Sequence, residues 1–235
     1  MVKMGKVIMR RLVLWGHHLD EYRDMFQLSE ADLTKRFLEY GSGATAVNFE
    51  LQDLASECIS CDPWFHLNIA ALKTEITANF DARLQQFKTE KQVFDLSRYG
   101  DLDTLLAYRR EGIATFLADY DQGRLDKRYL PVVDTELPFG HFAFDFALSA
   151  HCLFADLDYQ TVDYHVGVIK ELARVAKDVR IFPLVDARGI PSPLLGPVLL
   201  ALQQANYGVE VRDVSYHLQP KGNAMLRVWA HQCQV

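Results

Sequence analysis

The stretch from Arg36 to Leu54 constrains the fold of this 235-residue chain more than any other. A short apolar segment, residues 36–39, runs directly into Tyr40-Gly-Ser-Gly-Ala-Thr45, and residues 46–54 can continue as a helix. Glycines permit a sharp turn and let a ligand approach the backbone amides at the start of a helix. This order of strand, glycine turn and helix predicts the first part of a βαβ unit.

A second strand, expected from Glu57 to Cys61, completes this unit and ends at an acidic residue. Asp62 follows the strand directly, and Pro63 stops further pairing because proline has no N–H to donate. At this distance beyond the glycine turn, a carboxylate can accept hydrogen bonds from both hydroxyls of a ribose. The turn and Asp62 together predict a cradle for a nucleotide-like ligand.

Helices are expected at both ends of this unit. Residues 18–34 contain helical patterns, so residues 1–32 are expected to form an N-terminal helical cap. Apolar positions recur at three- and four-residue steps through residues 65–95 and 101–120. A crossover between neighbouring strands needs only one helix, so we expect residues 65–125 to form a helical insertion, a candidate lid or recognition element.

The second half of the chain alternates strands and helices and then ends in a hairpin. Strands are expected at 129–133, 144–149 and 179–185, and helices near 159–176 and 193–206. Two antiparallel strands, 209–218 and 225–231, flank a turn that contains proline and glycine. We therefore predict one α/β domain over residues 1–235, with a Rossmann-like doubly wound sheet and helices on both faces.

Composition disfavours several classes of partner. Hydrophobic residues make up 49% of the chain and charged residues 24%, as in an ordinary globular protein. The formal charge of −6 provides no strong positive field for nucleic acid or an anionic membrane. No apolar run approaches the ~20 residues of a spanning helix, and no signal-peptide pattern opens the chain. We expect a soluble, cytoplasmic protein; composition does not predict its oligomeric state.

The cysteines and histidines do not predict a metal site. Cys58 and Cys61 form a C-x-x-C without a second pair, so both are expected to be reduced thiols of the core. His17, His18 and His165 lack the spacing that would bring ligands together on one helix face. His17 and His18 are expected to lie at the surface or to have a local structural role.

The glycine turn by itself fits two classes of ligand. G-x-G-x-x-A also occurs in dinucleotide sites, so an NAD-dependent oxidoreductase is one alternative. Glu39, two positions before the first glycine, disfavours it because a carboxylate there would repel a pyrophosphate. S-adenosylmethionine carries an ammonium and a sulfonium and no phosphate, so it is compatible with Glu39.

At these positions the chain resembles the class I S-adenosylmethionine-dependent methyltransferases. An acidic residue followed by G-x-G ends the first strand of that family, and a second acidic residue ends the next. Glu39, Gly41, Gly43 and Asp62 stand at these positions. The segment from His17 to Phe26 is similar to one found in an uncharacterised bacterial methyltransferase-like group.

The resemblance spans residues 33–231. Residues 133–139, with an L-P-F turn, and residues 144–148 resemble the end of the family's third strand and its fourth strand. The closing hairpin is also similar. The resemblance implies a seven-stranded sheet of order 3-2-1-4-5-7-6, with the last strand antiparallel.

The resemblance also implies a cofactor, S-adenosyl-L-methionine, and a set of residues that bind it. An acidic residue at the position of Asp134 lies near the adenine amine in the family. The expected cofactor-binding residues are Glu39, Gly41, Ser42, Gly43, Asp62, Pro63, Asp134, Thr135, Ser149 and Ala150.

The methyl acceptor is not predicted beyond its class. Ser149-Ala150-His151 stands where the family usually carries N-P-P-Y or D-P-P-Y as the sign of methylation at an amino group of a base or glutamine. The expected acceptor is a small molecule or a protein side chain. His151 is the candidate general base, since histidine titrates near neutral pH; a packed structural histidine is the alternative. Arg109 and Arg110 could clamp an acidic acceptor or lie on a solvated helix face. A catalytically silent methyltransferase-like binding or scaffold protein is a further alternative.

Overall fold

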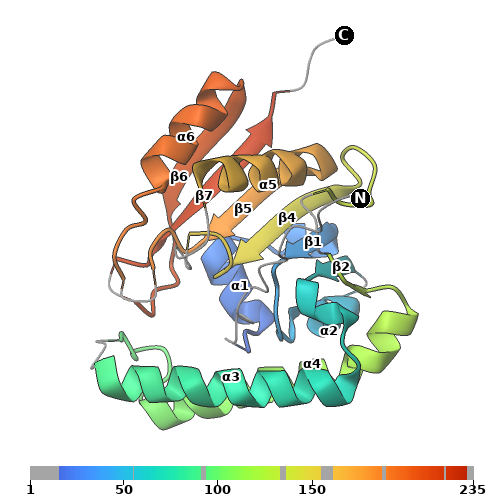
Figure 1. Cartoon of the computed structure of the whole chain (residues 1–235), viewed down its shortest axis with the longest axis vertical. Helices are drawn as coiled ribbons and strands as arrows, with labels where there is room; N and C mark the ends of the chain where they lie inside the picture. The colour runs from blue at the N-terminus through green and yellow to red at the C-terminus, as the bar shows by residue number, and fades with distance from the viewer. Residues whose placement is uncertain are drawn as a thin grey trace, which may run out of the picture.

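A single mixed sheet organises the chain in the computed structural model, which describes residues 16–54, 56–90, 94–132, 136–154, 161–186, 189–219 and 221–231. The strands follow the order β3-β2-β1-β4-β5-β7-β6 (Figure 1). Their bounds are Arg36–Tyr40 (β1), Glu57–Cys61 (β2), Tyr129–Leu130 (β3), Phe144–Ala150 (β4), Ala176–Phe182 (β5), Tyr207–Asp213 (β6) and Ala224–Ala230 (β7). Strands β1 to β5 pair in parallel, and β7 lies antiparallel between β5 and β6. The expected fold class, strand order and antiparallel last strand are confirmed.

Helices cover both faces of this sheet. The α-helices are Leu19–Phe26 (α1), Val47–Gln52 (α2), Ile69–Glu90 (α3), Leu102–Leu125 (α4), Val162–Val175 (α5) and Leu195–Gln204 (α6), and the short 3-10 helices are Asp32–Thr34 (η1) and Pro63–His66 (η2). Side chains alternate across each strand, so Leu38 packs beneath α5 and α6 while Phe37 packs beneath α1 and α2. None of the described helices combines the length and apolar content that crossing a membrane requires.

Some expected elements have different bounds, for local reasons. The strand expected at 129–133 is only Tyr129–Leu130, because Pro131 follows and cannot donate to the ladder. The helical pattern at 18–34 forms two pieces, α1 and η1, since the chain leaves α1 through Gln27 in the left-handed conformation. Residues 1–15 of the expected cap lie outside the described residues. Strand β6 starts at Tyr207 and ends at Asp213, earlier than the expected 209–218.

Helix α4 belongs partly to the ordinary crossover between β2 and β3. Its second half buries Phe116 and Tyr120 against Phe65 and Tyr129, and Arg128 makes a two-pronged ion pair with Asp119 just before β3. Helix α3 packs along α4 (Figure 1). Helices α3 and α4 thus lie within the insertion expected at 65–125, with α4 fixed to the sheet and α3 packed against α4; a role as a lid stays a prediction.

The N-terminal segment crosses α4 with direct backbone contact. Gly16 and Gly112 face each other, and a Cβ added to either residue would lie well inside contact distance of backbone atoms of the opposite segment. Gly16 also has a positive φ of 51°. Only glycine permits this approach, because no side chain separates the two backbones.

We therefore expect Gly112→Ala to destabilise the protein by about 2 kcal/mol despite the higher helix propensity of alanine. Gly167→Ala is the matched control, because Gly167 also lies in a helix but a Cβ there meets open space. That control should gain about 0.5–1 kcal/mol. Chemical denaturation monitored by circular dichroism measures the free energy of unfolding of both variants. Equal changes in Gly112→Ala and Gly167→Ala would contradict the backbone contact.

Candidate functional site

The glycine turn joins the carboxyl ends of β1 and β2. The Gly41 amide donates to the Cys61 carbonyl at 2.8 Å, so the turn continues the pairing of the two strands. Gly41 and Gly43 have φ values of 65° and 60°, which L side chains rarely adopt. Ser42 lies between them, and all three residues are buried. The backbone conformation of this turn thus favours glycine at both of its ends, and the sequence provides it.

Asp62 and the glycine turn are in direct contact. The Asp62 Oδ2 atom accepts from the Gly43 amide at 3.1 Å, and Oδ1 accepts from the Trp64 amide at 2.9 Å. Pro63 follows as the first residue of η2, where its missing N–H leaves no donor unsatisfied. Both carboxylate oxygens are therefore directed at backbone amides at the edge of the sheet where the two strands end.

Glu39 lies beneath the turn, on the face that packs against α1 and α2. Its carboxylate accepts hydrogen bonds from the hydroxyls of Thr45, at 3.2 Å, and Ser60. Burial raises the pKa of Glu39, while hydrogen bonds from Ser60, Tyr22 and Thr45 oppose that shift. Through Thr45, which ends the turn segment, Glu39 supports the turn from below.

The end of β4 contributes a buried hydroxyl with no partner. Ser149 is 0% exposed, and its Oγ atom makes no hydrogen bond within the described residues. Ala150, which follows it, is also buried. Asp134 and Thr135, the other residues expected at this edge of the sheet, lie outside the described residues.

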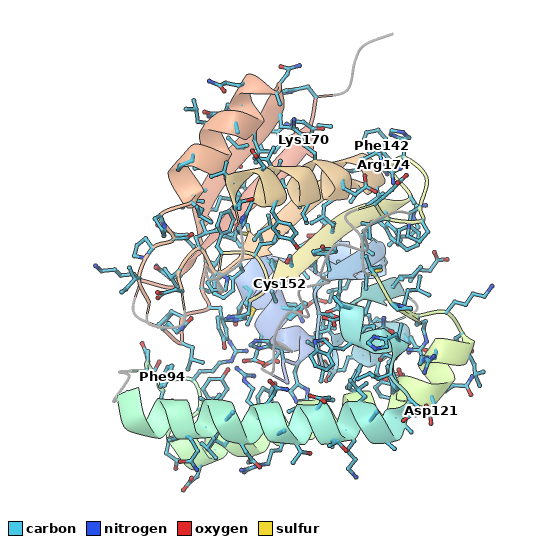
Figure 2. The ribbon with its side chains drawn as sticks, viewed as in Figure 1. Phe94, Asp121, Phe142, Cys152, Lys170 and Arg174 are labelled. Atoms are coloured by element: carbon cyan, nitrogen blue, oxygen red, sulfur yellow. The ribbon has the colours of Figure 1, made fainter. Side chains whose placement is uncertain are left out.

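His151 leaves β4 at its carboxyl end with a positive φ of 52°. Its backbone amide donates to the Phe182 carbonyl at 2.6 Å, and the residue is 7% exposed. The imidazole stacks on the ring of His17, with centroids 5.0 Å apart and planes 12° apart. The next residue, Cys152, lies near the middle of the molecule at the end of β4 (Figure 2). Positive φ values outside glycine concentrate at functional or strained positions.

A buried charged cluster adjoins these two histidines. The Nδ1 atom of His17 lies 3.1 Å from Oε2 of Glu21. Arg109 of α4 binds both oxygens of the same carboxylate. The hydroxyls of Tyr99 and Tyr216 also donate to Glu21, the second at 3.1 Å. The cluster thus joins the N-terminal segment, α4 and the loop between β6 and β7 at the carboxyl end of β4.

The electrostatics of the cluster follow from its burial. Although burial favours neutral Glu21, His17 and Arg109 hold its pKa well below the usual range. Burial, followed by the Arg109 charge, lowers the pKa of His17 to about 4. The pair of charges on Glu21 and Arg109 is therefore retained, while His17 is neutral at neutral pH.

The solvated helix face expected for Arg109 is wrong, since this side chain is 2% exposed, whereas Arg110 beside it is exposed. Likewise His17, at 1% exposure, is not a surface residue. A signal was present in the sequence: Arg109 shares one face of α4 with residues that are apolar or small, namely Leu105, Gly112 and Phe116. An arginine on such a face needs a buried acidic partner.

Metal-binding groups are not assembled in the part of the chain that the structure describes, where no set of His, Cys, Asp and Glu side chains could hold an ion. Cys58 and Cys61 are buried free thiols. Burial raises the pKa of both.

No family model matches the chain. An uncharacterised protein of Methanocaldococcus jannaschii is 25% identical over 215 residues, which cover 91% of this chain and 94% of that protein. Among solved structures, a SAM-dependent methyltransferase from Aquifex aeolicus is similar at 16% identity and a TM-score of 0.40, over 88% of this chain and 90% of that one. Magnesium protoporphyrin IX methyltransferase from Synechocystis is similar at 8% identity and a TM-score of 0.43, over 86% and 73% of the two chains.

The His17 environment predicts a pH dependence of stability. In the unfolded chain the histidine binds a proton near pH 6.5, whereas in the folded protein it does so near pH 4. The unfolded state therefore binds more protons between these values, so the free energy of unfolding falls as the pH falls through this window. The variant His17→Asn has no titrating ring, and its amide can still donate to Glu21. Between pH 7 and pH 5, its free energy of unfolding should therefore fall by about 2 kcal/mol less than that of the wild-type protein.

The measurement is urea denaturation of both proteins at several pH values. His18 has a raised pKa and the opposite slope, but it is present in both proteins and cancels in the difference. His141→Asn, at an exposed position, is the control variant. Parallel pH profiles for wild type and His17→Asn would contradict the prediction.

Proposed function

We propose that this protein is an S-adenosylmethionine-dependent methyltransferase whose acceptor is a small molecule or a protein side chain. The observation that carries the proposal is the contact between Gly43 and Asp62, which places a glycine turn and a ribose-binding carboxylate together. This contact lies in a sheet whose order and reversed β7 match those that the methyltransferase resemblance implies.

The residues at the site fit such a cofactor. Gly41 and Gly43 leave the backbone of the turn without side chains, and Asp62 is the carboxylate proposed to accept from ribose hydroxyls. The partnerless Oγ atom of Ser149 supports a ligand at the end of β4, because a buried hydroxyl without a hydrogen bond is costly. Pro63 and Ala150 would add backbone contacts, and Asp134 and Thr135 are proposed to complete the adenine end.

Bound at this site, the cofactor supplies an electrophilic methyl group. The protein then has to align the acceptor and remove its proton, which are the two tasks that position and basicity can perform. His151 stands at the carboxyl end of the central strand β4, the edge at which open α/β sheets bind ligands. We assign it the role of general base.

Two rival functions differ in what they predict. The NAD-dependent oxidoreductase requires a pyrophosphate at the turn, above the buried carboxylate of Glu39. A catalytically silent binding protein is favoured by the burial of His151, which is 7% exposed. The formal charge of −6 supports a small molecule or a protein, rather than nucleic acid, as the partner.

Isothermal titration with S-adenosylhomocysteine is the first test. We expect micromolar binding that weakens at least tenfold in Asp62→Asn, because the ribose hydroxyls lose a charged acceptor. Asp163→Asn, at an exposed position in α5, is the matched control and should bind like wild type. Thermal melts of all three proteins separate lost binding from lost folding. Binding of NADH instead, or no binding of either ligand, would overturn the proposal.

Ser149→Ala should change stability and binding in opposite directions. Removing a buried hydroxyl that lacks a partner should stabilise the ligand-free protein by about 1 kcal/mol. The same change should weaken S-adenosylhomocysteine binding several-fold, because the hydroxyl is proposed to bond the ligand. Denaturation and calorimetry on one preparation measure both effects; a variant that is less stable yet binds normally would assign Ser149 a purely structural role.

A further inference from the structure

The stacked rings of His17 and His151 come from distant parts of the chain. His17 precedes α1 and His151 follows β4, and the parallel arrangement places one imidazole face against the other at 5.0 Å. Among the described residues, the Phe182 ring also meets His151, edge to face at 5.6 Å, and it cannot titrate. His17 is thus a titratable ring in contact with the proposed base.

The position and tautomer of His17 are set by Glu21. An ionised carboxylate only accepts hydrogen bonds, so the Nδ1 atom that faces Glu21 carries the hydrogen. Glu21 is itself fixed by Arg109, Tyr99 and Tyr216. Burial and the neighbouring arginine lower the pKa of His17 to about 4, which keeps the ring neutral. A rigid, neutral aromatic face therefore lies against His151.

Charged and titratable groups of the described residues surround the stack from several elements, and His18, the chain neighbour of His17, is one of the groups that lower the pKa of His17. Helix α1 contributes Glu21 and Tyr22, and α4 contributes Arg109. The segment before α4 contributes Tyr99, and the β6–β7 loop contributes Tyr216. Burial raises the pKa of all three tyrosines, so they are neutral. The charges of Glu21 and Arg109 are paired with each other, and the ring contact with His17 lies directly against His151.

We propose that His17 is a positioning residue that stabilises the protonated form of His151. The inference rests on the proposed function, in which the acceptor gives its proton to a ring nitrogen of His151 as its heteroatom forms a bond to the methyl carbon. The electron pair of the broken carbon–sulfur bond stays on sulfur. The positive charge then resides on the His151 ring, against the neutral face of His17, until the proton passes to water.

The size of the effect follows from the geometry. A cation within about 6 Å of an aromatic ring centre, over its face and away from water, is stabilised by electrostatic attraction. At a buried stack, this attraction should raise the proton affinity of His151 roughly tenfold. The stack would therefore make His151 a stronger base than burial alone permits.

The test is a titration of His151 by NMR in the full-length protein labelled with ¹³C and ¹⁵N in histidine, with the signal assigned through His151→Asn. In His17→Asn, which keeps the donor to Glu21 and loses the ring, the proton affinity of His151 should fall roughly tenfold. His17→Phe keeps an aromatic face and should stay within about threefold of wild type. His141→Asn, at an exposed position, is the control and should leave His151 unchanged.

Either of two results would overturn the inference: a His151 proton affinity that His17→Asn leaves unchanged, or one that it raises. If that variant does not fold, ¹⁵N shifts in the wild-type protein decide, because His17 must be neutral with its hydrogen on Nδ1 from pH 5 to pH 8. S-adenosylhomocysteine binding is measured on the same samples. If His17→Asn lowers the proton affinity of His151 but the protein does not bind S-adenosylhomocysteine, the proposed function is overturned. If the protein binds S-adenosylhomocysteine but the proton affinity of His151 does not change, only the role of His17 is overturned.

Discussion

The buried ion pair between Glu21 and Arg109 connects the parts of the chain that adjoin the site. Taking two charges out of water is costly, and the two-pronged contact with added tyrosine hydroxyls offsets that cost. Removing either partner would leave an unpaired buried charge, so α1 and α4 depend on each other. Since His17 bonds to the same carboxylate, the orientation of its ring against His151 depends on this ion pair as well.

Helix α4 is held at both ends, which limits what the insertion can do. Arg109 fixes its first half to α1, and the ion pair of Asp119 with Arg128 fixes its second half beside β3. Helix α3 packs against α4 across a groove of about 420 Å³ with Ile76, Phe80 and Ile113 in its lining. A lid movement, which stays a prediction, would require α3 to shift along α4, because moving α4 would break the ion pairs of Arg109 and Asp119.

The fold could be predicted from the sequence because each of its elements follows from a local sequence pattern. Much of the site could not be predicted, because it depends on contacts between distant residues. Alternating strands and helices, the glycine turn and the closing hairpin each occupy a short segment, and the sheet order followed from them and the family resemblance. The sequence likewise predicted Asp62 and the glycine turn as parts of one cradle, and the structure adds the hydrogen bond between Asp62 and Gly43. The cluster around Glu21 joins residues from five separate segments. No periodicity reveals that an acidic residue and a distant arginine are buried together.

The two carboxylates at the glycine turn have different partners and therefore different roles. Glu39 accepts from hydroxyls beneath the turn, while Asp62 accepts from backbone amides of the turn and of η2. On the proposed function, Glu39 is enclosed by its hydroxyl donors and supports the turn from below, where any negative charge on it would disfavour a pyrophosphate. Asp62 lies at the turn itself and is the carboxylate proposed to recognise the ligand's hydroxyls.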